Sequence, residues 1–150
     1  MKSIFQNILI AAIILCSASL LAQKPVAYDS PRYEYKLAKE LFQKQKYGSA
    51  QQYFKQVYEF SEDKQQDLKA ESYFYMGLCA AKLSNQDAAF LLSDFIRQYP
   101  VHAFVPQAHY HLGMYYFSTK QYKKVLEQFD EIDERVVNKD DLAEFRFKKG

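Results

Sequence analysis

Apolar residues recur at spacings of three and four along most of the chain after residue 30. One stripe contains Leu37, Leu41 and Phe42, and a later stripe contains Val125 and Phe129. This spacing is typical of amphipathic helices, and no segment keeps the period of two that a half-buried strand requires. The pattern predicts helices over 31–44, 47–61, 65–83, 86–98, 105–118, 121–137 and 141–150. The expected fold class is therefore all-α.

A longer repeat is superimposed on the helical spacing. The small residues Ala38, Gly77, Gly113 and Gly150 are separated by 39, 36 and 37 positions. Positions twelve and nineteen residues after the first three are again apolar: Ala50, Ala89 and Val125, then Val57, Ile96 and Ile132. The repeat predicts helix-pair units at about 31–63, 64–102 and 103–139, with a partial unit at 140–150.

The residues around two of these glycines align with a known signature, an aromatic residue followed by Leu-Gly and then Tyr. They are Tyr73, Met76, Gly77 and Ala80 in one unit, and His109, Leu112, Gly113 and Tyr116 in the next. The chain therefore resembles the tetratricopeptide repeat family, of the exported bacterial type, over 31–150. Glu34 and Ser93 depart from the aromatic residues of the family pattern, and the units run slightly long. The resemblance implies an α-solenoid of antiparallel helix pairs, with about three units and the start of a fourth.

Gly77 and Gly113 have a physical reason to lie inside helices. A glycine there costs about 1 kcal/mol relative to alanine, which suggests that close packing requires it. We expect each glycine to let the second helix of its unit approach through Ala89 or Val125. Pro106 suits the first turn of a helix, and either Asp140 or Asp141 can cap the last one.

The first 22 residues have the order of a secretory signal. A positive charge at Lys2 precedes an apolar segment, and Ala22 supplies a small residue before a cut at Gln23. The pattern predicts a signal peptide over 1–22, a linker over 23–30, and export to the periplasm or cell envelope, with possible association with the outer membrane. Two alternatives remain open: an uncleaved membrane anchor, and a lipoprotein modified at Cys16. Cleavage would leave Cys79 as the single cysteine, expected to be a buried thiol.

Charge and residue motifs favour binding over chemistry. The net charge of +2 comes from 20 basic and 18 acidic residues that are interspersed, unlike the concentrated basic patch of a nucleic-acid-binding protein. His109 and His111 are two residues apart and point to different sides of a helix, which disfavours a metal site. No nucleophile elbow, phosphate loop or Cys-x-x-Cys motif occurs, so we expect neither an enzyme nor a cofactor.

The resemblance also implies where a protein or peptide partner would bind. In the family, the first helices of successive units line a concave groove. The corresponding candidates are Tyr35, Lys39, Phe42, Phe74, Tyr75, Leu78, Tyr110, His111, Met114 and Phe117. For each of them the alternative is packing between units. Lys36 and Lys39 could hold a carboxylate, but no groove Asn accompanies them, so the carboxylate clamp of the family is not expected.

Three functions remain open at this point. The first is an exported protein-interaction scaffold. The second is a component of outer-membrane assembly or envelope maintenance, similar to repeat lipoproteins. The third is the recruiting arm of an enzyme whose catalytic domain follows Gly150. Because the last predicted helix lacks its partner and an array needs a terminal cap, we expect the sequence to be the N-terminal part of a longer repeat protein.

Overall fold

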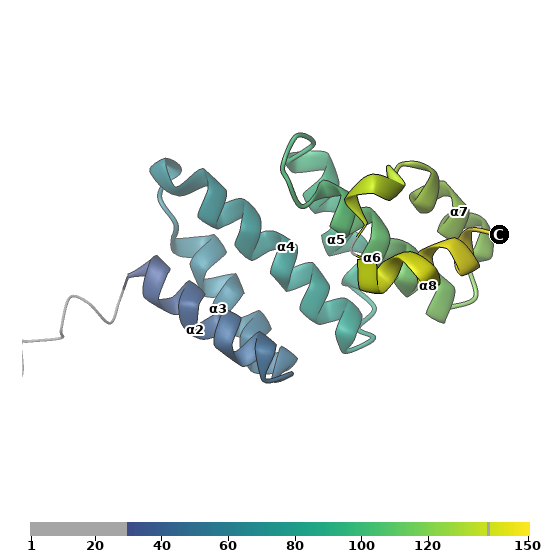
Figure 1. Cartoon of the computed structure of the whole chain (residues 1–150). Coiled ribbons are helices and arrows are strands. Elements are labelled where there is room, and N and C mark those ends of the chain that lie inside the picture. The colour runs from purple at the N-terminus through teal and green to yellow at the C-terminus, as the bar shows by residue number, and fades with distance from the viewer. Residues whose placement is uncertain (1–29, 138) are drawn as a thin grey trace, which may run out of the picture.

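The computed structural model describes residues 30–137 and 139–150, and every regular element in this part of the chain is helical (Figure 1). No β-strand occurs among these residues, which confirms the all-α fold class. The predicted signal peptide and nearly all of the predicted linker lie outside the described residues.

The α-helices follow one another as antiparallel neighbours. They are α2 (Pro31–Gln43), α3 (Tyr47–Phe60), α4 (Gln66–Lys82), α5 (Ala88–Gln98), α6 (Val105–Ser118), α7 (Tyr122–Asp130) and α8 (Lys139–Lys149), with 3-10 turns η2 (Asp63–Gln65) and η3 (Glu134–Val136). Each helix packs on the next along the chain, and α4 also contacts α2 and α6. This arrangement is consistent with an α-solenoid, with α2 at one end and α8 at the other (Figure 1).

The helix α6 has the predicted bounds, and most other boundaries fall within two residues of their predicted positions. The predicted helix over 121–137 is too long, because α7 ends at Asp130 and Ile132 turns inward to become 5% exposed. The prediction of a cap at Asp140 or Asp141 is also wrong. Since α8 begins at Lys139, both carboxylates lie in its first turn, where they face the positive end of the helix dipole.

The same turn ends the first helix of each complete helix pair. Gln45, Ser84 and Lys120 have φ values of 58°, 57° and 61°, and each lies seven residues after Ala38, Gly77 or Gly113. The backbone N–H of the following residue donates to a carbonyl five residues earlier in all three cases, as in a Schellman motif. The turn repeats without the glycine that usually adopts this conformation.

Gly77 and Gly113 each lie where the two helices of a pair meet. A Cβ atom added at Gly77 would come within 2.9 Å of the Leu92 side chain, and one at Gly113 within 2.3 Å of the Phe129 ring. This confirms the predicted close approach. The nearest partners are one helical turn later than the predicted Ala89 and Val125, since the larger side chains at Leu92 and Phe129 reach across to the bare backbone.

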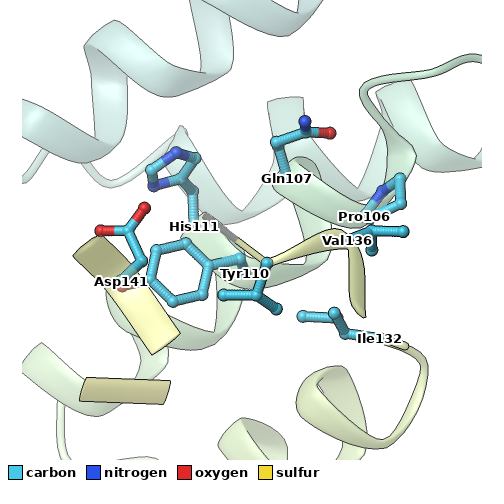
Figure 2. A pocket seen from close by; sticks show the side chains of 8 residues that line it. Pro106, Gln107, Tyr110, His111, Ile132, Val136 and Asp141 are labelled. Atoms are coloured by element: carbon cyan, nitrogen blue, oxygen red, sulfur yellow. The ribbon is translucent and has the colours of Figure 1, made fainter. Parts of the chain in front are cut away.

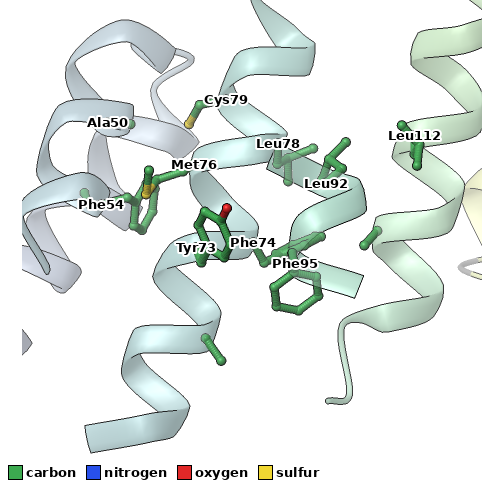
Figure 3. Packing of buried hydrophobic residues seen from close by; sticks show 13 residues of the cluster. Ala50, Phe54, Tyr73, Phe74, Met76, Leu78, Cys79, Leu92, Phe95 and Leu112 are labelled. Carbon is green, nitrogen blue, oxygen red and sulfur yellow. The ribbon is translucent and has the colours of Figure 1, made fainter. Parts of the chain in front are cut away.

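The core consists of two clusters of buried residues. The larger one joins α2 to α6 and centres on residues such as Phe54, Phe74 and Phe95 (Figure 3). The smaller one joins α6, α7 and α8. Its buried members are Tyr110, Val125, Phe129, Ile132 and Phe145.

Candidate binding groove

Three of the predicted groove residues lie in the core. Phe74, Leu78 and Tyr110 are only 3%, 6% and 7% exposed, so their assignment to an open groove is wrong. The ring of Phe74 packs against Phe95, with centroids 5.5 Å apart, and Tyr110 stacks on a neighbouring ring at 6.0 Å. These side chains turn toward the second helices of their units because large apolar surface is stabilised by burial there.

Four others form the joint between α2 and α4. Tyr35, Lys39, Phe42 and Tyr75 are half-buried, and the rings of Phe42 and Tyr75 lie 5.3 Å apart. The Tyr35 hydroxyl donates a hydrogen bond to the Glu71 carboxylate, and Lys39 Nζ donates to the Tyr75 hydroxyl. Burial raises the pKa of Tyr35, and the bond to the carboxylate raises it further, so this phenol remains a neutral donor. The four residues therefore hold α2 against α4, the first helices of two successive helix pairs.

The last three predicted residues lie on α6 and are largely enclosed. His111 lies near the rings of Phe74 and Tyr110, and burial together with the Lys82 charge lowers its pKa to about 4. Met114 and Phe117 are half-buried beneath Lys148, whose Nζ lies 4.2 Å from the Phe117 ring centroid. The α6 surface that the sequence assigned to a groove is thus covered in part by α8.

A small cavity lies beside His111, between α6 and the segment that leads into α8 (Figure 2). Its volume of about 50 Å³ is enough for only one or two water molecules. The side-chain oxygen of Gln107 is buried at this position without a hydrogen-bond partner among the described residues. The cavity is too small to bind a partner side chain.

Two larger pockets open on the sides of α4. The first has a volume of about 380 Å³ and lies between α2 and α4, lined by Arg32, Tyr35, Asp67, Leu68 and Glu71. The second, of about 540 Å³, lies between the start of α4 and the loop that joins α5 to α6. Its lining comprises Gln66, Asp67, Ala70, Glu71, Gln98, Tyr99, Pro100, Val101, His102, Ala103 and Phe104. Because both pockets share Asp67 and Glu71, we treat them as one surface and call it the α4 groove.

The loop that borders the α4 groove is held by local hydrogen bonds. The backbone N–H of His102 donates to the Tyr99 carbonyl at 3.0 Å, and the Phe104 N–H donates to His102 Nδ1 at 3.1 Å. Phe104 anchors the loop by packing on Phe74, with ring centroids 4.9 Å apart. The turn presents Val101 to solvent, where it is 98% exposed.

Most residues of the α4 groove are not among those that the sequence pattern predicts. Tyr35 was the one predicted residue that lines it, whereas Arg32, Asp67, Val101 and Phe104 were not considered. A signal was available in Val101, because an apolar residue directly after Pro100, between two helices, has no helical stripe to join. The acidic pair gave no such signal, since carboxylates on an outer helix face are most often simply solvated.

The described residues include side chains of the metal-ligating types and the Cys79 thiol. No group of three His, Cys, Asp or Glu side chains among them could hold a metal ion. Cys79 is buried, as predicted, and burial raises the pKa of its thiol to about 12, so it is not poised as a nucleophile.

Among the residues that the structure describes, none of the helices has the length and apolar character needed to cross a membrane.

Comparison of the sequence with protein-family models and with curated proteins gave no match.

Proposed function

We propose that this chain is an exported tetratricopeptide-type scaffold that binds a segment of another protein and carries out no chemistry itself. Export to the periplasm or cell envelope is inferred from the charge and apolar pattern of residues 1–22. Assignment to the repeat family is supported by the three identical turns at Gln45, Ser84 and Lys120. It is also supported by the two glycines at equivalent helix contacts.

The α4 groove is the observation that carries the binding proposal. Its two pockets are open, have volumes in the range of ligand-binding pockets, and mix apolar with charged lining. Helix pairs that stack in this way present a continuous surface across units, which suits a peptide segment better than a small molecule. Within the described residues the predicted face of α6 is less suitable, because Lys148 lies over Phe117.

A site-specific cross-linking experiment tests the binding proposal. A photo-reactive amino acid placed at Val101, in the full-length chain expressed in its own cells, is expected to give adducts of discrete mass with one or a few proteins. The matched control is Phe90, which is 66% exposed at the other end of α5 and lines neither pocket. Equal adducts at the two positions, or none at Val101, would contradict binding in the α4 groove.

The mass of the mature N-terminus tests export in the same cells. A start at Gln23 is the expected result. A lipid-modified Cys16 would instead favour attachment to a membrane, and an intact Met1 would contradict cleavage.

A further inference from the structure

We infer that the α4 groove selects a peptide segment in which a lysine or arginine is followed or preceded closely by an aliphatic or aromatic residue. This inference rests on the proposed function, because it names the partner chemistry for the same site. It is supported by two features: the carboxylates that the two pockets share, and the apolar loop beside them.

The centre of the α4 groove is acidic. Asp67 and Glu71 are four residues apart on α4, so their carboxylates project from the same face of the helix. Asp67 lies in the first turn, where the helix dipole stabilises it, whereas Glu71 lies one turn further along and gains less. Within the part of the chain that the structure describes, the Glu71 carboxylate accepts its side-chain hydrogen bond from the neutral Tyr35 hydroxyl. A cation from a partner would relieve the repulsion between two like charges at this spacing.

No ion pair between described residues uses either of these carboxylates. Other carboxylates in the same part of the chain do find cations, for example Asp94 with Arg97 and Glu59 with Lys55. Arg32 lines the pocket between α2 and α4 but forms no ion pair with another described residue. Asp67 and Glu71 therefore leave a local excess of negative charge, which is complementary to a basic side chain.

The side of the α4 groove formed by the loop between α5 and α6 is apolar. Tyr99, Pro100, Val101 and Phe104 line the larger pocket, and the hydrogen-bonded turn holds Val101 almost fully in water. An apolar residue presented on an ordered turn gains stability only when a partner covers it. Because this surface adjoins Asp67 and Glu71 in the same pocket, one short segment can place an apolar side chain and a cation there together.

The charge of the α4 groove also excludes two other classes of partner. Anionic membranes and nucleic acids are bound by clusters of Lys and Arg. The lining contains two carboxylates and one guanidinium, so these groups together carry a negative formal charge. A basic protein segment is the class that fits both the charge and the apolar loop.

A random peptide library displayed on phage, selected on the immobilised chain without residues 1–22, tests the inference. The expected consensus contains Lys or Arg within a few positions of Leu, Ile, Val, Phe or Tyr. A fluorescein-labelled peptide with the most enriched sequence then gives dissociation constants by fluorescence anisotropy at low and high salt. We expect weaker binding at high salt, because exposed charges are screened.

Single substitutions then assign the contacts. Asp67→Asn and Glu71→Gln are each expected to raise the dissociation constant of the labelled peptide by about two- to fivefold at low salt. Each should also make the dissociation constant depend less on salt concentration. Glu71→Gln keeps an oxygen that accepts from Tyr35. The matched control Glu127→Gln removes an exposed carboxylate from α7 and should leave binding unchanged. Val101→Ser should weaken binding at both salt concentrations alike, and thermal unfolding of each variant checks that the fold is retained.

The outcomes separate this inference from the function it rests on. Enriched peptides that lack basic residues, or binding that Asp67→Asn and Glu71→Gln leave unchanged, would overturn the inference while leaving peptide binding intact. Selection that enriches no sequence would count against both. Sedimentation of the chain provides the remaining check: self-association that is lost in Val101→Ser would show that a second copy occupies the α4 groove, and would also overturn the inference.

Discussion

The helix pairs that contain α2 to α5 and the region formed by α6, α7 and α8 follow the same repeat but differ in how they are held together. The first region shares one large cluster of buried side chains, which extends into α6 through Ala108 and Leu112. The second has a smaller cluster with five buried members, and its helix α7 has 9 residues where the equivalent α3 has 14. In a repeat protein each unit is stabilised mainly by its neighbours, so stability is expected to decrease from the first region to the second.

The contacts between units also differ in how much they rely on ion pairs. Between α2 and α4 the joint includes packed rings such as Phe42 and Tyr75, whose centroids lie 5.3 Å apart. Between α7 and α8 the rings of Phe129 and Phe145 pack with centroids 4.8 Å apart. The joint also uses a partly exposed cation, because Lys149 Nζ donates to the Phe129 carbonyl at 3.2 Å and lies 3.2 Å from the Asp130 carboxylate. Exposed ion pairs contribute about 0–1 kcal/mol and are screened by salt, whereas buried rings contribute more and are not screened. The joint at α8 is therefore expected to open first.

The largest expected effect comes from removing one fully buried ring in each region. Phe95→Ala should lower the free energy of unfolding by about 3–5 kcal/mol, because it leaves a cavity in the large cluster. Phe145→Ala should cost less, because the loss cannot exceed the free energy with which α8 docks on α6 and α7. Urea unfolding followed by circular dichroism gives the two free energies.

Hydrogen exchange measured by mass spectrometry locates the two effects. In Phe145→Ala the loss of protection should be confined to α8 and the end of α7, whereas in Phe95→Ala it should extend over α4, α5 and α6. Loss of protection throughout the chain in Phe145→Ala would show that both regions form a single cooperative unit.

The fold could be predicted largely from the sequence, because helical spacing and a small residue every 36 to 39 positions are local signals. The end of α7 could not, since it depends on Ile132 turning into a cluster that Phe145 completes from another helix. The left-handed turns at Gln45, Ser84 and Lys120 were also missed, because none of the three is a glycine or asparagine. Their conformation is imposed by the hydrogen bonds of the turn rather than by residue type.

The candidate site was predicted less well, for a physical reason. The spacing indicates which face of a first helix looks away from its own partner, but not what the neighbouring unit places over that face. Phe74 packs against Phe104 and His111 of the following helix pair, and Phe117 is covered by Lys148. Residues of the α4 groove such as Val101 belong to a loop whose path depends on Phe104 reaching Phe74.

Two titrating groups, Asp94 and His111, are expected to make the stability of the fold depend on pH in different ranges. The Tyr73 hydroxyl and Arg97 lower the pKa of Asp94 in the first region, so its contribution to stability is complete above the ordinary value of 3.8. That contribution is lost only as the pH falls through the lower folded-state value. His111, at the junction with the second region, has its pKa lowered from 6.5 to about 4 by burial and by Lys82. Since the unfolded chain then binds the proton more readily, stability falls from pH 6.5 down to about 4.

The expected result is a loss of stability between pH 6.5 and 4 that originates at His111. Urea unfolding of the parent and of His111→Gln across this window measures it, and the variant should show a flatter profile. Asp94→Asn serves as the control, because its effect should be constant above pH 3.8 and diminish only below it. A parallel decline in parent and His111→Gln would assign the acid sensitivity to other groups.

The smallest expected effect distinguishes a glycine that packing requires from one that it does not. Gly48 is exposed in the first turn of α3 with no atom within 4 Å of an added Cβ, so Gly48→Ala should stabilise the chain by about 0.5–1 kcal/mol through helix propensity. At Gly113 the added methyl would meet the Phe129 ring at 2.3 Å, and that ring is fixed between Tyr110 and Phe145. Overpacking at about 1–3 kcal/mol should exceed the gain in propensity, so Gly113→Ala should be destabilising. Thermal and urea unfolding of both variants measure the signs, and a stabilised Gly113→Ala would show that the second region is loose enough for the Phe129 ring to move aside.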